Sequence, residues 1–278
     1  MTMTVLLIVL ALLFTAAAVS YFFWVNRQTQ GLTKGSEDKS QIPKDEEYSH
    51  MIVHELRAPV VAIKDSASIL LSDKLSEGEE KKMLNLIHDE AKKLLRQIST
   101  ILDAAKVADG KLSLKKTRGD IANLVREEMA LFQPEAKRKN INIISDIEPG
   151  LPSFFFDNVR ITEALNNILS NSLKYTNENG IIKVNVTKGG ENVVISVADN
   201  GIGIAAEKQS RLFSKFEELG GSMDKKKESL SSGLGLYITK WIVEAHGGTI
   251  KITSEEGKGT TTIFTLPLDT NEPAQEMP

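Results

Sequence analysis

Four short blocks of the sequence hold side chains whose types and spacing could do chemistry. They are HELRAP at 54–59, NNILSNSLKYT at 166–176, DNGIGI at 199–204 and SSGLGLYITK at 231–240. The first sets a histidine beside a glutamate, and the second puts Asn167 and Asn171 one turn apart on one helix face. The third block has an aspartate followed by two glycines, and the fourth has two glycines at the start of a predicted helix. These residue types allow a histidine nucleophile, amide metal ligands and an anion-binding helix N-terminus.

Taken alone, each block is a weak signal, because Gly-x-Gly is common in turns and an asparagine pair on a helix usually caps or packs. Their order and spacing are highly specific. Together they resemble the sensor histidine kinases of two-component signalling over about residues 48–268. The resemblance implies a dimerisation domain with the H-box, then an ATPase domain with the N, G1, F and G2 boxes. It also implies the Bergerat ATP-binding fold, shared with gyrase and the chaperone ATPases, with ATP and Mg²⁺ as cofactors.

The residue types of the nucleotide blocks suit these roles on physical grounds. Asp199 ends an apolar strand pattern, and its fixed carboxylate can accept a hydrogen bond from the amino group of adenine. Gly201 and Gly203 leave room for the backbone to approach the base, and they permit positive φ. Asn171 offers a neutral amide oxygen, which suits Mg²⁺ that already carries phosphate oxygens and water.

The second glycine pair, Gly233 and Gly235, opens a helix whose free N–H groups and dipole favour phosphate. The sequence has no Walker-type Gly-x-x-x-x-Gly-Lys-Ser/Thr and no protein-kinase His-Arg-Asp or Asp-Phe-Gly set, so nucleotide binding must come from these blocks. The family pattern adds polar, aromatic and lid contacts. These further expected nucleotide contacts are Asn167, Lys174, Tyr175, Phe213, Phe216, Leu234, Leu236 and Thr260.

The resemblance makes His54 the phosphoacceptor, whose neutral imidazole nitrogen attacks the γ-phosphate of ATP. Glu55 can accept the proton from the other ring nitrogen as a general base. Arg57 is expected to contact phosphate or the ATPase domain. An exposed helical histidine is more often a plain surface residue, and His50 is interpreted in that way. For His54, the downstream blocks favour the chemical role.

The phosphoryl group is expected to pass to an aspartate in the receiver domain of a separate response regulator, since no receiver domain follows residue 268. Members of this class usually have threonine or asparagine four residues after the histidine, where it helps orient water for phosphatase action. Ala58 stands there in this sequence, so we predict weak phosphatase activity. Two rival hypotheses are a Bergerat-fold ATPase without phosphohistidine and a non-catalytic dimeric scaffold.

Two amphipathic helices must position His54. One pattern runs from about Tyr48 to Ser72, and Pro59, which removes one backbone N–H, is interpreted as a hinge in it. At about 100° per residue, His54 lies roughly 200° from the apolar positions Ile52 and Leu56 and faces away from them. The second pattern steps by three and four, which predicts a homodimeric four-helix bundle; an ordinary hairpin packed on the rest of the chain is the alternative. Its positions are Leu84, Ile87, Ala91, Leu94, Ile98, Ile101, Ala105 and Ala108.

The rest of the chain predicts an α+β sandwich of helices and antiparallel strands, which begins after DGKL at 109–112. Period-2 alternation predicts strands, and Asp157 is expected to cap a helix. The predicted strands are 112–116, 141–147, 153–156, 182–187 and 193–199, with a closing hairpin at 247–268. The predicted helices are 120–137, 157–173 and 233–245, and residues 200–232 are a Gly-rich polar stretch.

The N-terminus carries no charge from Val5 to Val25. As a helix these residues would be about 31 Å long, close to the hydrocarbon thickness of a bilayer. Aromatic residues close the run and Arg27 follows, which predicts a single-pass membrane anchor with everything after it in the cytoplasm; a cleaved signal peptide is the alternative. Only about four residues precede the anchor, so no extracytoplasmic sensor domain is expected.

Composition limits the remaining possibilities. The net charge of −3 gives no reason to expect nucleic-acid binding, and the absence of cysteine excludes disulfides and thiolate metal sites. The expected division of the chain is an anchor at 1–25, a linker at 26–47, a dimerisation and phosphotransfer domain at 48–110, an ATP-binding domain at 111–268 and a disordered tail at 269–278.

Overall fold

The computed structural model of the chain describes residues 42–71, 75–215 and 233–269. The predicted anchor, Phe216 and the tail after Asp269 lie outside these residues. None of the described helices is long and apolar enough to cross a membrane. Two compact units are distinguished, residues 1–47 and 48–278, and the second contains both domains expected from the sequence.

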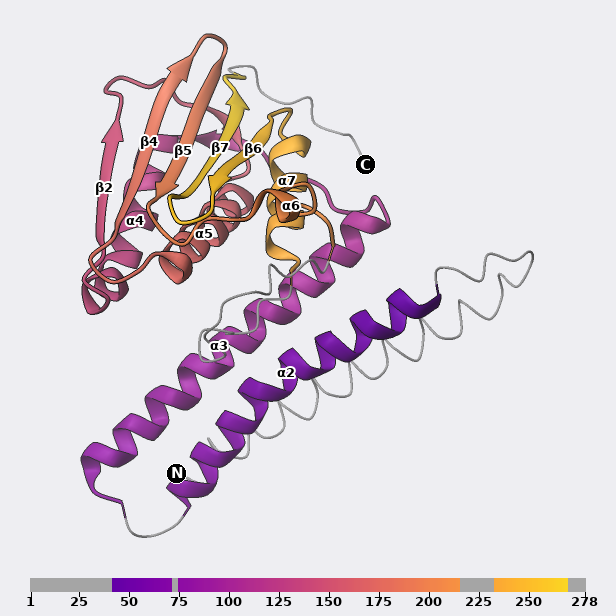
Figure 1. The fold of residues 1–278 in the computed structure, drawn as a ribbon, viewed down its shortest axis with the longest axis vertical. Helices are drawn as coiled ribbons and strands as arrows, with labels where there is room; N and C mark the ends of the chain where they lie inside the picture. Colours follow the sequence, from indigo (N-terminus) through magenta and orange to yellow (C-terminus); the bar gives the residue numbers. More distant parts are fainter. Residues whose placement is uncertain (1–41, 72–74, 216–232, 270–278) are drawn as a thin grey trace. The chain divides into compact units, whose positions relative to one another are not determined.

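A long helical hairpin comes first (Figure 1). It is formed by α2 (Ile42–Leu70) and α3 (Glu77–Ala108). The first helix starts six residues before the predicted Tyr48, because a proline such as Pro43 fits the first turn of a helix, where its missing N–H would have no partner. The second begins at a capping box, in which the Ser76 N–H donates to the Glu79 carboxylate at 2.9 Å. Helix α2 runs unbroken through Pro59.

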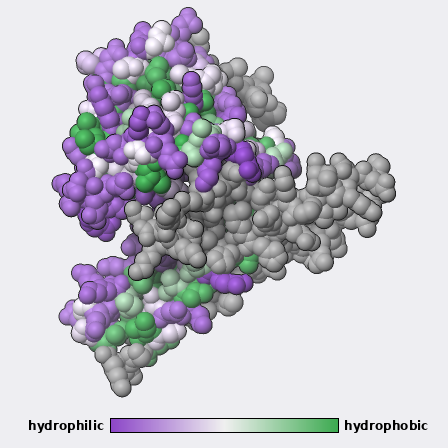
Figure 2. Space-filling model, in the orientation of Figure 1, coloured by the Kyte–Doolittle hydropathy of each residue, from purple (hydrophilic) through white to green (hydrophobic). Residues whose placement is uncertain are grey.

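The predicted seam of the hairpin is partly covered. Ile52 and Leu94 are buried, as their spacing predicts, and Pro59 and Ile63 are buried as well, whereas the seam residue Leu84 is 58% exposed. Figure 2 shows hydrophobic residues on the visible face of the hairpin near its turn. The hairpin also leaves other large apolar side chains exposed, namely Val53, Val60, Val61, Ile69, Leu71, Leu86, Leu95 and Leu102. One hairpin therefore does not bury its own apolar surface.

The α+β domain confirms the predicted sandwich. Five of the described strands form one sheet in the order β2-β4-β5-β7-β6, with helices on one face (Figure 1). The strands are β1 (Thr117–Gly119), β2 (Asn142–Ile147), β3 (Phe154–Phe156), β4 (Ile181–Gly189), β5 (Asn192–Asp199), β6 (Ile250–Glu255) and β7 (Gly259–Pro267). The helices are α4 (Ile121–Arg138), α5 (Asn158–Tyr175), α6 (Ala206–Gln209) and α7 (Gly235–Ala245).

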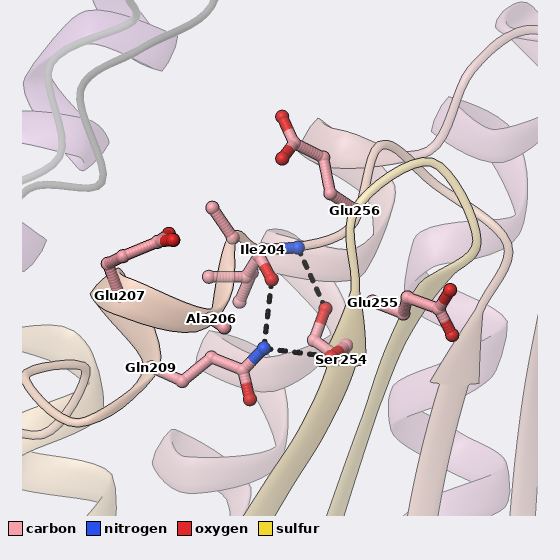
Figure 3. Close-up of a pocket in the computed structure, with 8 residues that line it drawn as sticks. Ile204, Ala206, Glu207, Gln209, Ser254, Glu255 and Glu256 are labelled. Carbon is pink, nitrogen blue, oxygen red and sulfur yellow. Dashed lines mark hydrogen bonds between the residues drawn. The ribbon is translucent and has the colours of Figure 1, made fainter.

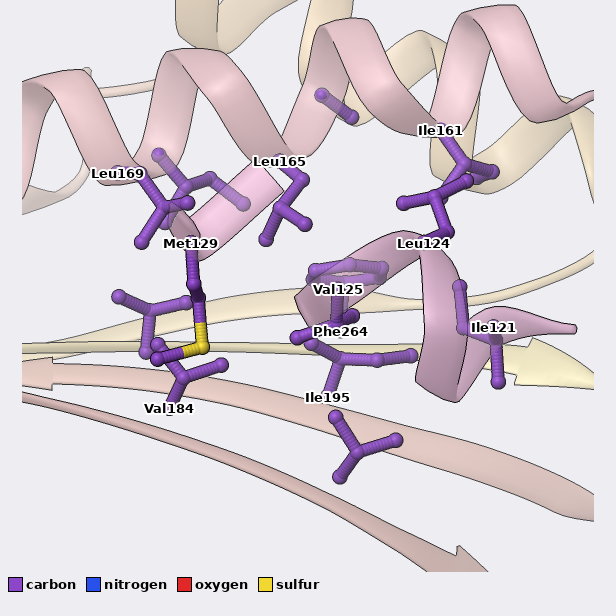
Figure 4. Close-up of a cluster of buried hydrophobic side chains, with 14 of the residues drawn as sticks. Ile121, Leu124, Val125, Met129, Ile161, Leu165, Leu169, Val184, Ile195 and Phe264 are labelled. Carbon is purple, nitrogen blue, oxygen red and sulfur yellow. The ribbon is translucent and has the colours of Figure 1, made fainter. Parts of the chain in front are cut away.

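The core of this domain lies between the sheet and its helices. Figure 4 shows Met129 of α4 and Leu165 of α5 above Val184, Ile195 and Phe264 of the strands. Alternate residues of β4 and β5 are buried, so the period-2 pattern of the sequence reports the inner face of the sheet. Burying a side chain of this size contributes about 1.5–3 kcal/mol, so this layer stabilises the fold around the site.

Two expectations about the strands are corrected. Residues 112–116 form no strand, although their burial alternates, because the Lys115 N–H donates to the Asp157 carboxylate at 2.7 Å rather than to a neighbouring strand. The short strand follows at β1, paired with β3. Strand β2 is parallel to β4, unlike the other pairs of the sheet, because the connection between them runs through β3 and α5 and is long enough to cross back to the same end of the sheet. The helix α6 falls in a stretch that was predicted as irregular.

The end of α3 joins the α+β domain. Ala104 belongs to the core of that domain, and Ile101 packs against it. Beside them, Asp103 pairs with Arg160 in the first turn of α5, at 2.5 Å. Arg160 also pairs with Glu163, at 2.7 Å. The hairpin and the helix that carries Asn167 and Asn171 are thus connected by a nearly buried ion pair.

Candidate functional site

Asp199 stands at the centre of the candidate site, at the last position of β5. Its Oδ1 accepts hydrogen bonds from the Gly201 N–H at 3.0 Å and from the Thr260 N–H at 3.2 Å. Its Oδ2 accepts one from the Ser172 hydroxyl at 3.1 Å. Burial raises the pKa of the Asp199 carboxyl above its ordinary value, and the three donors act against that rise because they favour the charged form. The side chain is therefore a fixed acceptor, as its position at the end of a strand predicts.

The first glycine pair is required by the protein backbone itself. A Cβ at Gly201 would collide with the carbonyl oxygen of Tyr175, and one at Gly203 with that of Glu255. Gly203 also has φ +67°, which L side chains rarely adopt. The Ile202 N–H donates to Tyr175 O at 3.1 Å, so the loop is held against the end of α5. In the structure their missing side chains make room for protein backbone, and the expected approach of a base stays a prediction.

The two asparagines lie on α5, one turn apart. Asn167 donates through Nδ2 to the Thr239 hydroxyl of α7 at 2.9 Å, and a Cβ at Gly235 would collide with the Asn167 side chain. Asn167 therefore holds α5 against the first turns of α7. Asn171 is half-buried. Its neighbour Lys174 lies with Nζ 5.0 Å from the centre of the Tyr175 ring.

The second glycine pair precedes α7. Gly233 has φ +58°, and Leu234 is fully buried, so Leu234 anchors the helix start in the core while Leu236 is half-buried. The first N–H groups of a helix have no partner within it, which makes this end of α7 suitable for phosphate. Of the F-box residues, Phe213 is half-buried, with Lys240 Nζ 5.7 Å from its ring centre.

A pocket of about 260 Å³ lies beside this site (Figure 3). Gln209 closes one side by donating to Ile204 O at 2.9 Å and to Ser254 O at 2.8 Å. Three carboxylates line it, and none of the predicted nucleotide residues does. These carboxylates would repel a triphosphate, and the predicted nucleotide residues lie outside this pocket. Ser254 also contacts the Thr260 hydroxyl, at 2.9 Å.

The residues present fit Mg²⁺ that arrives with a nucleotide. Among the described residues, no three His, Asp or Glu side chains cluster in a way that could hold a metal ion. Asn171 supplies a single amide oxygen on the face shared with Asn167. Such a donor set suits a cation whose remaining ligands are phosphate oxygens and water.

The phosphoacceptor side is described only in part. The side chains of His54 and Glu55 lie outside what the structure describes, so their predicted orientation is not tested. Arg57 and Ala58, beside them on α2, are both exposed, and Leu56 is half-buried. The helix face on which His54 was predicted to lie is thus exposed to solvent at Ala58, one turn later.

Two features of the site were not predicted from the sequence. Ser172 contacts Asp199, although it lies 27 positions away. His246 is buried; its Nε2 accepts from the Asp157 N–H at 2.9 Å, and its Nδ1 donates to Ile242 O at 2.7 Å. Burial lowers the pKa of His246, which is therefore a neutral structural group. Partners so far apart in the chain leave no local signal.

Two family models match the chain. Residues 45–110 match the His Kinase A (phospho-acceptor) domain, and residues 156–270 match the histidine kinase-, DNA gyrase B- and HSP90-like ATPase domain. Both domains of the histidine kinase core are present, in the expected order. The chain belongs to the histidine kinase family.

Curated relatives of this histidine kinase family agree. The chain is 30% identical to the sensor histidine kinase ZraS of Escherichia coli over 268 residues, which is 95% of this chain and 55% of the relative. It is 32% identical to the circadian input-output histidine kinase CikA of Synechococcus elongatus over 84% of this chain and 31% of the relative. An uncharacterized sensor-like histidine kinase of Rhizobium meliloti is 28% identical over 89% of this chain and 47% of its own length. The chain thus spans about half or less of these relatives.

Solved structures of histidine kinases share the fold. ShkA, crystallised in complex with AMPPNP, has a TM-score of 0.60 at 28% identity, over 81% of this chain and 46% of that chain. ThkA in complex with the response regulator protein TrrA has a TM-score of 0.56 at 24% identity, over 81% of this chain and 62% of that chain. At that identity the second likeness concerns the fold alone.

Proposed function

We propose that the chain is an ATP-dependent protein histidine kinase that phosphorylates itself on His54. The observation that carries the proposal is the pairing, in one chain, of a matched phosphoacceptor domain containing His54 with an ATPase fold. In that fold three donors hold Asp199 as an acceptor for adenine. The start of α7 would take the phosphates. Asn171 would hold Mg²⁺, which when bound neutralises charge on the phosphate oxygens.

The reaction follows from these groups. A ring nitrogen of His54 uses its lone pair to form a bond to the γ-phosphorus, while the bond from that phosphorus to the β–γ bridging oxygen breaks and ADP leaves with that electron pair. Glu55 takes the proton from the other ring nitrogen, which keeps the imidazole nucleophilic. In a second step, an aspartate of a response regulator receiver domain takes the phosphoryl group from His54. Catalysis in such transfers is mainly positioning.

Incubation of the full chain with γ-labelled ATP tests the first step. We expect acid-labile, alkali-stable label in the unmodified chain and in His50→Ala, a control one turn away on the same helix, but none in His54→Ala. Label that survives His54→Ala would sink the proposal. Release of ADP without any labelled protein would favour the rival reading as an ATPase without phosphohistidine.

A homodimer would complete the phosphoacceptor domain. The apolar side chains that one hairpin leaves exposed would be covered by a second copy in a four-helix bundle. Leu95→Asp, at a residue of α3 that is 59% exposed, should then give a monomer in sedimentation analysis. Leu131→Asp is the matched control, because Leu131 is 71% exposed but lies on α4. A monomeric unmodified chain would refute the dimer.

The uncharged segment from Val5 to Val25 would anchor the kinase in the cell membrane, with the catalytic part in the cytoplasm. Extraction of cell membranes with alkaline carbonate tests this. We expect the full chain to stay in the membrane pellet and a chain that lacks residues 1–25 to be released. Release of the full chain would contradict the anchor.

A further inference from the structure

Ser172 is a buried hydroxyl that no predicted role uses. It lies in the last turn of α5, is 6% exposed, and donates through Oγ to Asp199 Oδ2 at 3.1 Å. The carbonyl oxygen of Ser172 accepts from the Thr176 hydroxyl at 2.6 Å, a contact that any residue at this position would keep. The contact with Asp199, in contrast, depends on the hydroxyl of Ser172.

A count of lone pairs shows what that contact does. A carboxylate has about four acceptor positions, two on each oxygen. Two backbone N–H groups fill both positions on Asp199 Oδ1, and Ser172 fills one on Oδ2. One acceptor position on Oδ2 is left for a ligand. Since the terminal torsion of an aspartate is soft, the donor on Oδ2 determines where that last position points.

We infer that Ser172 is a positioning residue for adenine, because its hydroxyl orients Asp199 so that Oδ2 accepts from the exocyclic amino group. The inference rests on the proposed nucleotide site and deepens it. Adenine offers a donor at this position, whereas a base with a carbonyl there offers a second acceptor. Loss of the hydroxyl should therefore weaken the discrimination between bases more than it weakens the hold on the triphosphate.

The surroundings of Asp199 make its charge depend on these donors. Ser172 of α5 contacts Asp199, and the cross-strand partners of Asp199 are Ile182 on β4 and Thr260 on β7; none of these three residues is ionisable. Burial raises the pKa of the Asp199 carboxyl, and the Ser172 hydroxyl is one of the groups that lower it. Ser172→Ala should raise that pKa further, so the acid limb of ATP binding should move to higher pH.

Calorimetric titration of the full chain with ATP and with purine riboside triphosphate, which lacks the exocyclic amino group, separates orientation from general stability. In Ser172→Ala we expect ATP affinity to fall about tenfold, the size expected for one lost hydrogen bond to a charged group, while affinity for the analogue changes less than about twofold. Ser172→Cys keeps most of the volume without a strong donor and should behave in the same way. Ser172→Thr keeps the hydroxyl and should restore selectivity.

Ser170→Ala is the matched control, because Ser170 is exposed on the same helix, two residues earlier, and should bind both nucleotides as the unmodified chain does. Equal weakening of both nucleotides in Ser172→Ala and Ser172→Cys would show a merely structural serine and overturn the inference. Unchanged ATP affinity in these variants would overturn it too and leave the kinase proposal intact. An unmodified chain that binds no ATP would refute both the inference about Ser172 and the kinase proposal.

Discussion

The ion pair between Asp103 and Arg160 should couple the hairpin to the α+β domain measurably. The two side chains are only 10% and 20% exposed, and their charged atoms are 2.5 Å apart. Two unit charges at about 4 Å attract by about 1 kcal/mol in water and by about 4 kcal/mol at an effective dielectric of 20. Desolvation cancels part of that gain, and Arg160 keeps Glu163 as a second partner when Asp103 is changed.

We therefore expect a coupling free energy of about 1.5 kcal/mol, above that of exposed pairs and below the cost of breaking a fully buried one. A double-mutant cycle with Asp103→Asn and Arg160→Gln measures it through urea unfolding followed by far-UV circular dichroism. Lys106→Gln is the control, because Lys106 also pairs with Asp103, at 3.6 Å, but is 54% exposed. It should change the free energy of unfolding by less than about 0.5 kcal/mol.

A coupling below about 0.5 kcal/mol would refute the reasoning, because the pair would then behave as a surface contact. Salt gives an independent check. A nearly buried pair is screened weakly, so raising the salt from 0.1 to 1 M should remove less than about half of the coupling. A coupling that disappears in 1 M salt would show instead that water reaches both charges.

Three further variants test single features of the fold and site. Gly203→Ala places a Cβ against the backbone of Glu255 at positive φ and should lower the free energy of unfolding by about 2 kcal/mol and abolish ATP binding; normal binding would contradict this. His246 has a lowered pKa, so the unfolded state takes up its proton first; stability should be full above about pH 6.5 and fall below it, and His246→Gln should flatten that slope in thermal melts. Ala58→Thr should increase the rate at which the chain dephosphorylates the proposed response regulator. Rapid dephosphorylation by the unmodified chain would refute the prediction of weak phosphatase activity.

Local signals predicted most of the fold. The side chains of Asp120 and Asp157 accept from Asn123 N–H and Arg160 N–H at 3.0 and 3.1 Å, so helices α4 and α5 begin where their caps predict. The period of the apolar residues identified the long helices and the strands of the sheet. The strand at 112–116 was wrong, because alternation records which side chains are covered and not whether a partner strand exists.

The contacts within the site were less predictable than its residue types. Family order selected Asp199 and Asn171, but nothing near Ser172 in the sequence marks it as a partner of Asp199. Nothing in the sequence marks the close approach of Gly203 to Glu255 either. Both contacts depend on how segments far apart in the chain meet in the fold. Sequence patterns report the environment of one segment at a time, whereas such contacts depend on the tertiary fold.

Asp199 shows why binding and folding are difficult to separate in this domain. Its donors are Ser172 of α5, which lies 27 positions away in the chain, Thr260 of β7, which lies 61 positions away, and Gly201 of its own loop. The carboxylate therefore holds three segments together, and one acceptor position on its Oδ2 is left for the proposed base. Removing it would leave the Thr260 and Gly201 N–H groups without an acceptor, which costs about 1–3 kcal/mol for each group if it stays buried. Asp199→Asn keeps one amide oxygen for these donors, so it should lose ATP binding with a smaller loss of stability than Asp199→Ala. Equal losses of stability in the two variants would show that the carboxylate contributes nothing to the fold beyond its charge.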